Sequence, residues 1–179
     1  MTRIGSVYAQ ALYDLARDEG LSEAILKEMK LLRNAFSENA EFIRLLSTPN
    51  LSKDERVKIL DDSFAGRIQP YVLNFLKILT EKGYARHFSD CCEAYQELYN
   101  EDNGILPVRA VTAVPMTEEQ IKRLSLKLQE ITGKRIELEN RIDPKCLGGV
   151  RLDYDGKRVE DTVQHRLDAV RSLLKNTML

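Results

Sequence analysis

The chain has 179 residues, of which 43% are hydrophobic and 31% charged, and its net charge is −1. This composition excludes collagen-like, linker-dominated and disordered chains, and no apolar run is long enough to cross a bilayer. The near-zero net charge argues against nucleic-acid binding by bulk electrostatics, because that binding depends on many neutralised phosphates. We therefore expect a soluble, cytosolic, globular protein of one ordinary domain or two small ones.

Up to Gly104 the apolar residues recur with the period of an α-helix. Six helices are predicted, over residues 4–20, 22–36, 40–46, 52–64, 70–83 and 86–103. Ser22 is expected to cap the second helix, and Ser52 with Glu55 forms a capping box for the fourth. Pro70 suits the first turn of the fifth helix, which Gly83 closes. Short connections between these segments indicate a helical bundle.

After Gly104 the period changes towards two, which is typical of strands. The predicted elements are a strand over 108–114, a helix over 117–133, a strand over 136–142, a hairpin over 149–160 and a last helix from Val163 to Leu174. The hairpin turns at Asp155-Gly156, a strong hairpin signal. The chain is thus predicted to be a mostly helical α+β protein, with a six-helix bundle over 1–104 and a small β-α-β-β-β-α domain over 105–179.

The charge divides at the same place. Residues 1–104 hold 13 Lys and Arg against 17 Asp and Glu, a net charge of −4, whereas residues 105–179 hold 14 against 11, a net charge of +3. Two units of opposite sign suggest two different partners, although an asymmetry of this size also arises by chance.

Residues that could support catalysis, a metal or a cofactor are scarce. The sequence lacks the common nucleotide-binding, zinc-protease and hydrolase motifs. His87 and Cys91 have a spacing that suits metal ligands on a helix, but a closed zinc site needs four ligands, and burial of Cys91, Cys92 and Cys146 is the simpler interpretation. Gly148-Gly149 suits a sharp turn before the hairpin better than a phosphate cradle. We expect a non-catalytic protein without cofactor or metal.

Two predicted helices carry more apolar surface than one core-facing stripe requires. The first helix has a main stripe of Ile4, Val7, Tyr8, Ala11, Leu12 and Leu15, extended by Ala9, Tyr13 and Ala16. The fifth has Val72, Phe75, Leu76 and Leu79, extended by Tyr71 and Ile78. Either the bundle buries these helices centrally, or the surplus forms a docking site for an amphipathic helix of a partner.

Four segments then carry a family resemblance over the whole chain. YAQALY at 8–13 resembles a Y-A-x-A-L-F signature, and NFLKILTEKG at 74–83 resembles N-F-L-x-L-L-x-E-K-G-R, with Tyr84 in place of the Arg. IDPKCLGGV at 142–150 is similar to I-D-x-x-[LI]-[IL]-G-G-[VI]. VEDTVQHRL at 159–167 parallels I-D-x-S-x-x-x-x-L, with Glu160 and Thr162 in place of Asp and Ser. In this order the segments resemble the bacterial ATP synthase delta subunit family, relatives of mitochondrial OSCP.

The resemblance implies a non-catalytic stator subunit that links the catalytic head of an F-type ATP synthase to its peripheral stalk. The helical domain would receive the N-terminal helix of an alpha subunit in a groove between the first and fifth helices. By motif position, that groove would be lined by Tyr8, Ala11, Leu12, Asn74 and Ile78. The C-terminal domain would bind the stalk b subunits, with Gly148 and Gly149 structural. The protein would be present once per complex, peripherally, at the cytoplasmic face of the bacterial cell membrane.

An RNA-binding adaptor is the alternative, using the C-terminal domain and its net charge of +3. Such a function needs exposed aromatics on a basic face, or a GxxG loop between helices. Tyr154 is the only aromatic residue after Tyr99, and no GxxG occurs. The sequence therefore favours the stator.

Overall fold

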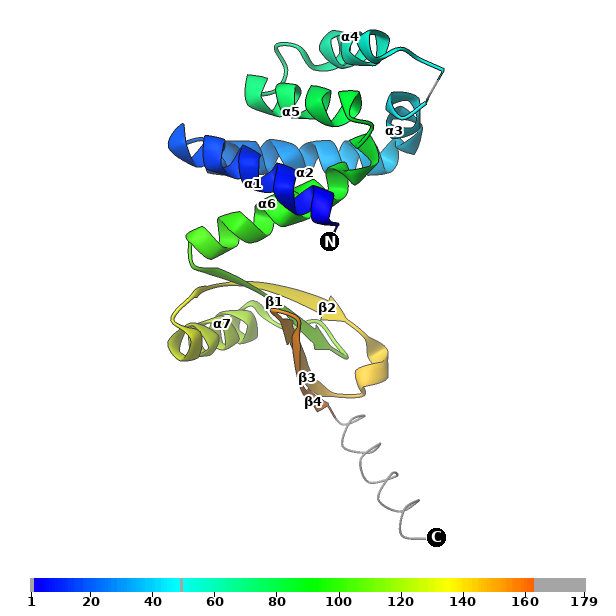
Figure 1. The fold of residues 1–179 in the computed structure, drawn as a ribbon. Helices are drawn as coiled ribbons and strands as arrows, with labels where there is room; N and C mark the ends of the chain where they lie inside the picture. Colours follow the sequence, from blue (N-terminus) through cyan, green and yellow to red (C-terminus); the bar gives the residue numbers. More distant parts are fainter. Residues whose placement is uncertain (1, 49, 163–179) are drawn as a thin grey trace, which may run out of the picture. The chain divides into compact units, whose positions relative to one another are not determined.

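A computed structural model describes residues 2–48 and 50–162 (Figure 1). The chain divides into two compact units, Met1–Tyr99 and Asn100–Leu179. The change of period at Gly104 lies just beyond this division. The predicted last helix, from Val163 to Leu174, falls outside the described residues.

The first unit is built from helices that lie close to their predicted positions. They are α1 (Arg3–Asp18), α2 (Ser22–Glu38), α3 (Ala40–Leu46), α4 (Lys53–Phe64), α5 (Pro70–Glu81) and α6 (Phe88–Asp102), which continues into the second unit. Two predicted helix starts are wrong. Ser22 is the first residue of α2 rather than its cap, and Leu21 in the cap position makes no side-chain bond to the helix. Arg86 lies in a separate 3-10 turn, η1 (Ala85–His87), before α6 begins.

Local capping explains where several of these helices begin and end. The Ser52 hydroxyl accepts a bond from the Glu55 N–H at 3.2 Å, and the Glu55 carboxylate accepts one from the Ser52 N–H at 2.8 Å, which confirms the predicted capping box. Pro70 occupies the first turn of α5, where its missing N–H has no intrahelical acceptor to lose. Gly83 follows α5 with φ of 76°, a conformation that glycine adopts without steric cost.

The core of the first unit is centred on aromatic side chains from different helices. The Phe36 ring of α2 contacts the rings of Phe42, Phe64 and Phe88, with centroid distances of 5.6, 6.1 and 5.2 Å. Tyr95 of α6 is fully buried, and its hydroxyl donates a bond to the Ser22 carbonyl at 3.1 Å. Four helices are thereby joined to one cluster, since these residues come from α2, α3, α4 and α6.

The face that α1 buries differs from the predicted one. Its buried residues are Gly5, Ala9, Leu12, Tyr13 and Ala16. Val7 and Leu15 of the predicted main stripe are 62% and 42% exposed, and Ala11 is exposed as well. The predicted core stripe is therefore wrong at Val7, Ala11 and Leu15, whereas Leu12 is buried and Ile4 and Tyr8 are half-buried. The physical reason is shape: the glycine and alanines present little side chain, so neighbouring helices approach this face closely.

The second unit is a mixed four-stranded sheet with one helix on it, which confirms the described part of the predicted β-α-β-β-β-α order. Its elements are β1 (Ile105–Thr112), α7 (Glu118–Thr132), β2 (Arg135–Ile142), the 3-10 turn η2 (Pro144–Cys146), β3 (Gly149–Tyr154) and β4 (Lys157–Thr162). The strand order is β2-β1-β3-β4, and only β1 and β2 run parallel. The crossover helix α7 makes that parallel pair possible.

The β3–β4 hairpin turns at Asp155 and Gly156, as predicted. Both residues have positive φ, 47° and 67°, which matches a two-residue turn whose twist suits the flanking strands. Asn140 of β2 makes three hydrogen bonds to neighbouring elements. Its amide N–H groups donate to the Ala110 carbonyl and the Thr112 hydroxyl of β1, both at 2.9 Å, and its amide oxygen accepts from the Met116 N–H at 2.8 Å. One side chain thus connects β2, β1 and the loop that leads to α7.

The helix α7 covers its unit incompletely. None of its described residues is fully buried, and Ile131, predicted to face inward, is 79% exposed. Ile121, Leu124 and Leu128 are half-buried towards β2, the edge strand that α7 contacts. Within residues 2–48 and 50–162, no helix combines the length and the apolar character that crossing a membrane requires.

Candidate docking surface on α1 and α5

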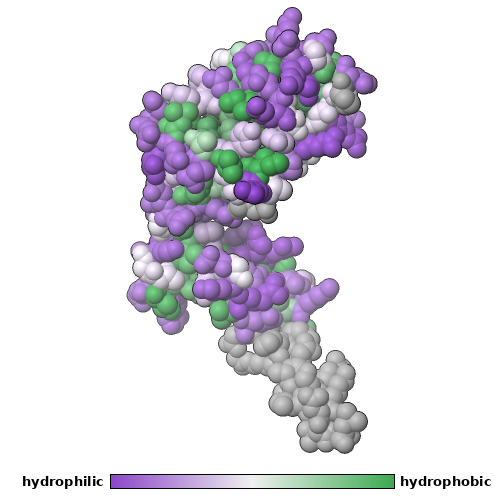
Figure 2. Space-filling model, viewed as in Figure 1, coloured by the Kyte–Doolittle hydropathy of each residue, from purple (hydrophilic) through white to green (hydrophobic). Residues whose placement is uncertain are grey.

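The outward face of α1 carries an unusual set of apolar side chains. We define the α1 strip as Ile4, Val7, Tyr8, Ala11 and Leu15. Ile4 and Tyr8 are half-buried, whereas the other three are exposed. Figure 2 shows apolar side chains interspersed with polar ones on this unit. Single exposed apolar residues are common on protein surfaces, but a strip along one helix face is typical of a docking surface.

The fifth helix contributes a second, smaller exposed set. Ile78 is 45% exposed and Asn74 is exposed, whereas Tyr71 is half-buried against the core. The predicted inward residues of α5, Val72, Phe75, Leu76 and Leu79, are all buried. The helix is therefore anchored by one face and offers Asn74 and Ile78 on the other.

A ring contact brings the two helices together. The Tyr8 ring of α1 lies edge-on to the Tyr84 ring, with centroids 5.9 Å apart. Tyr84 directly follows the end of α5, and its N–H donates to the carbonyl of Leu79 at 2.6 Å. The first half of α1 therefore lies beside the C-terminal end of α5, where Ile78 is exposed.

The start of α1 is fastened to α6 on the opposite side. The Thr2 hydroxyl caps α1 by accepting from the Gly5 N–H at 3.3 Å and donates to the Asp90 carboxylate at 2.6 Å. His87 lies 3.3 Å from the same carboxylate oxygen. The bond from Thr2, and then the bond from His87, hold the pKa of Asp90 below its ordinary value. These contacts fix the start of α1 against α6, while Val7, Ala11 and Leu15 of the strip stay exposed.

The residues predicted for the groove separate into two groups. Tyr8, Ala11, Asn74 and Ile78 reach the surface. Leu12 is only 5% exposed and belongs to the core cluster, so it supports α1 from below and offers little surface to a partner. Val7 and Leu15 belong to the strip but were missed as docking residues, because the period of α1 placed them in the core.

The remaining sequence candidates have structural surroundings. Gly149 begins β3 with φ of 82°, and Gly148 before it has φ of 157°, so a side chain is strained at both positions. Cys91 and Cys92 are buried, and desolvation raises the pKa of each thiol to about 12. His87 contacts Asp90 rather than Cys91. Among the described residues, no group of His, Cys, Asp and Glu could hold a metal ion.

Known proteins resemble this chain over almost its full length. Residues 4–174 match the sequence model of the family described as ATP synthase delta (OSCP) subunit. A protein of Clostridioides difficile named ATP synthase subunit delta is 30% identical over 176 residues, which cover 98% of this chain and 97% of that protein. A protein of the same name from Alkaliphilus oremlandii is 30% identical over 96% of each chain.

The fold is also found in a solved assembly. A chain in the cryo-EM structure of the Toxoplasma gondii mitochondrial ATP synthase hexamer aligns with a TM-score of 0.73 at 21% identity, over 97% of this chain and 98% of that chain. The RNA-binding alternative finds no support among these relatives. Taken with the helical unit, the small mixed sheet and the exposed α1 strip, the full-length match means that the chain belongs to the ATP synthase delta (OSCP) family, the non-catalytic stator subunits of F-type ATP synthases.

Proposed function

We propose that this chain joins the catalytic head of the synthase to its peripheral stalk, one copy per complex, peripherally at the cytoplasmic face of the bacterial membrane. In this arrangement the first unit binds the amphipathic N-terminal helix of an alpha subunit, and the second unit binds the b subunits. Torque from the rotor then meets a fixed head, so that rotation is coupled to ATP synthesis.

The α1 strip beside the end of α5 is the observation that supports the head contact. Val7 and Leu15 are 62% and 42% exposed, so covering their remaining apolar surface with a partner adds favourable free energy. Asn74 supplies a polar group beside Ile78 that can fix the register of a bound helix. A stator contact must dissociate slowly, and desolvated apolar anchors lengthen residence time more effectively than rim charges do.

Exposed apolar side chains on the second unit support the proposed contact with the stalk. Ile131 of α7, Ile142 of β2 and Val159 of β4 are 79%, 50% and 51% exposed. These three exposed apolar side chains come from three different elements of the unit. They provide apolar area to which the ends of stalk helices can bind.

Calorimetry with two ligands tests the proposal. The full chain is titrated separately with a peptide of the alpha-subunit N-terminus and with the C-terminal part of the b dimer. We expect saturable binding of both, with one alpha peptide per chain. Deletion of residues 105–179 should abolish b binding and preserve alpha binding. If the shortened chain still bound the b subunits, the assignment of partners to units would be wrong.

A further inference from the structure

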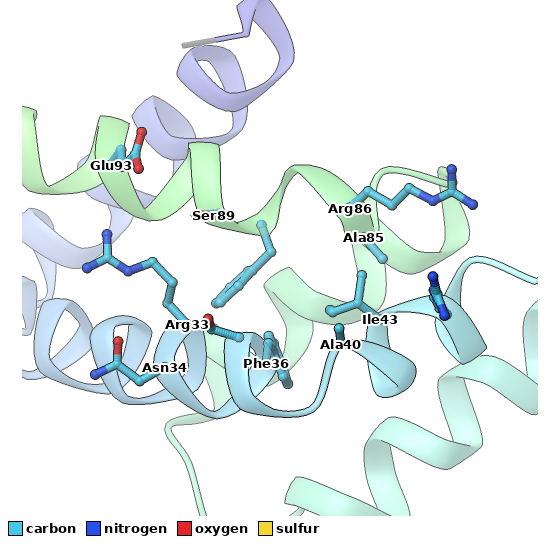
Figure 3. Close-up of a pocket in the computed structure, with 12 residues that line it drawn as sticks. Arg33, Asn34, Phe36, Ala40, Ile43, Ala85, Arg86, Ser89 and Glu93 are labelled. Carbon is cyan, nitrogen blue, oxygen red and sulfur yellow. The ribbon is translucent and has the colours of Figure 1, made fainter.

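A pocket of about 710 Å³ lies on the first unit, away from the proposed head contact (Figure 3). Its lining comes from α2, α3, η1 and α6, and contains no residue of α1 or α5. The floor is apolar: Phe36 and Phe88 are 8% and 3% exposed, and Ile43 is half-buried. The volume lies within the range of pockets that bind small molecules or short peptide segments.

Three arginines surround this floor. Arg33 comes from α2, Arg44 from α3 and Arg86 from η1, and Figure 3 shows Arg33 and Arg86 on opposite sides of Ile43. Glu93 is the single acidic residue in the lining. The pocket is therefore locally basic, although residues 1–104 carry a net charge of −4.

None of these three guanidinium groups is engaged within the part of the chain that the structure describes. No hydrogen bond or ion pair joins Arg33, Arg44 or Arg86 to a described residue. Arg56 on the same unit, by contrast, donates to the Leu46 carbonyl at 3.2 Å. Arginine presents a planar fork of donors that matches carboxylate geometry, so three unengaged forks around one pocket form a receptor for anionic groups.

We propose that this pocket binds a short, acidic, amphipathic helix of a partner polypeptide. Apolar side chains of that helix cover half-buried Ile43 and the small edges of Phe36 and Phe88 that reach the pocket, while its carboxylates pair with the three arginines. Because the pocket has an apolar floor and arginines at its edge, its ligand needs both apolar side chains and carboxylates. A simple anion leaves Ile43 uncovered, and a purely apolar helix leaves the arginines without a carboxylate partner.

The charge of the surroundings favours a short segment over a nucleic acid. A long polyanion extends beyond the pocket and meets the rest of the unit Met1–Tyr99, where 13 Lys and Arg against 15 Asp and Glu give a net charge of −2. Electrostatic interactions fade over about 8–10 Å at moderate salt, so a segment confined to the pocket experiences mainly the arginines. The site shares no lining residue with the α1 strip, so it can be occupied while α1 and α5 bind their own partner.

A synthetic helical peptide is the probe, used with the full chain. It has about four turns, with leucines along one face and glutamates elsewhere. Binding is followed by fluorescence anisotropy at low and at moderate salt. We expect saturable binding by the wild-type chain, and a loss of affinity of about tenfold or more for the variant Arg44→Glu/Arg86→Glu. Replacing every glutamate of the peptide by glutamine, or every leucine by serine, should each weaken binding.

A charge-matched variant separates the pocket from bulk electrostatics. Lys58→Glu/Arg67→Glu changes the net charge by the same amount at two exposed positions outside the pocket. It should bind the peptide as the wild type does, and thermal melts should show both variants folded. Equal losses in the two variants would overturn the proposal, as would no binding by the wild type. Full displacement of the peptide by millimolar phosphate, or arginine-dependent binding of anionic lipid vesicles without peptide binding, would also overturn it.

Discussion

Tyr8 of α1 and Tyr84, which follows α5, meet edge to face, with ring centroids 5.9 Å apart and planes inclined at 67°. Such a geometry places the positive edge of one ring over the negative face of the other and adds stability beyond apolar burial. Tyr8 therefore joins α1 to the end of α5, and in the proposed docking surface its outer edge would also contact the partner. Substitution of Tyr8 changes both.

Ile78→Asp should weaken binding of the alpha-subunit peptide by more than about 2 kcal/mol, because it places a charge in the apolar centre of the contact. Tyr8→Asp should do the same, with an added loss of stability from the broken ring contact. Calorimetry measures the binding, and Leu31→Asp is the control, since Leu31 of α2 is 69% exposed and lies outside the strip. Unchanged affinity in both Tyr8→Asp and Ile78→Asp would refute the docking surface.

Gly5→Ala should lower the free energy of unfolding by up to about 2 kcal/mol. A Cβ at this position would lie 2.8 Å from Asp90 Cβ and 3.1 Å from the Asp90 carbonyl carbon, so α1 and α6 must separate. Overpacking of this kind costs about 1–3 kcal/mol, which exceeds the helix-propensity gain of about 1 kcal/mol. Urea unfolding followed by circular dichroism measures the change. Gln10→Ala, exposed on the same helix, should change stability by less than about 0.5 kcal/mol.

Asn140→Ala should destabilise the second unit by about 2–3 kcal/mol, because it removes three hydrogen bonds and leaves a half-buried carbonyl and N–H without partners. Hydrogen exchange should show faster exchange for amides of β1 and β2, with little change in α2. The neighbouring variant Glu139→Ala, which loses only a surface ion pair to Arg109, is the control. Protection that stays at the wild-type level in Asn140→Ala would contradict the role given to this side chain.

Stability should fall in acid partly through Asp90. Because Thr2 and His87 favour its carboxylate form, the pKa of Asp90 is lower in the folded chain than in the unfolded chain. The stabilisation is therefore present above the unfolded pKa of about 4 and is lost as the pH falls through the lower folded pKa. Asp90→Asn should flatten the acid limb of the stability profile below about pH 4. If the stability of Asp90→Asn fell with decreasing pH as steeply as that of the wild type, Asp90 would not contribute to the loss of stability in acid.

The cysteines should resist thiol reagents in the folded chain. Cys91, Cys92 and Cys146 are 0%, 2% and 4% exposed, and burial raises the pKa of Cys91 and Cys92 to about 12, so that little thiolate forms at neutral pH. Titration with a chromogenic disulfide near pH 8 should give slow reaction in buffer and complete reaction in denaturant. Rapid native reaction of Cys91 or Cys92 would show that α6 opens readily.

Much of the architecture was predictable because its signals are local. Capping residues, such as Ser52 with Glu55, act within one turn, and the Asp155-Gly156 turn needs only two adjacent residues that accept positive φ. The prediction of Ser22 as a cap failed because α2 begins one residue earlier than a cap at Ser22 requires, so that Leu21 occupies the cap position. The inward prediction for Ile131 failed because the sheet leaves the last turn of α7 uncovered: Ile131 is 79% exposed, and no described residue of α7 is fully buried.

The sequence by itself determined the family, the two kinds of secondary structure and the surplus of apolar surface on α1 and α5. Only the tertiary structure decided which side of α1 is outside. Hydrophobicity favours burial of Val7 and Leu15, but Gly5 and Ala9 let neighbouring helices pack closely, and Thr2 with Asp90 fixes that side against α6. Close packing depends on the shape of both partners, which a periodic pattern in one helix does not contain. The same packing leaves Val7 and Leu15 exposed.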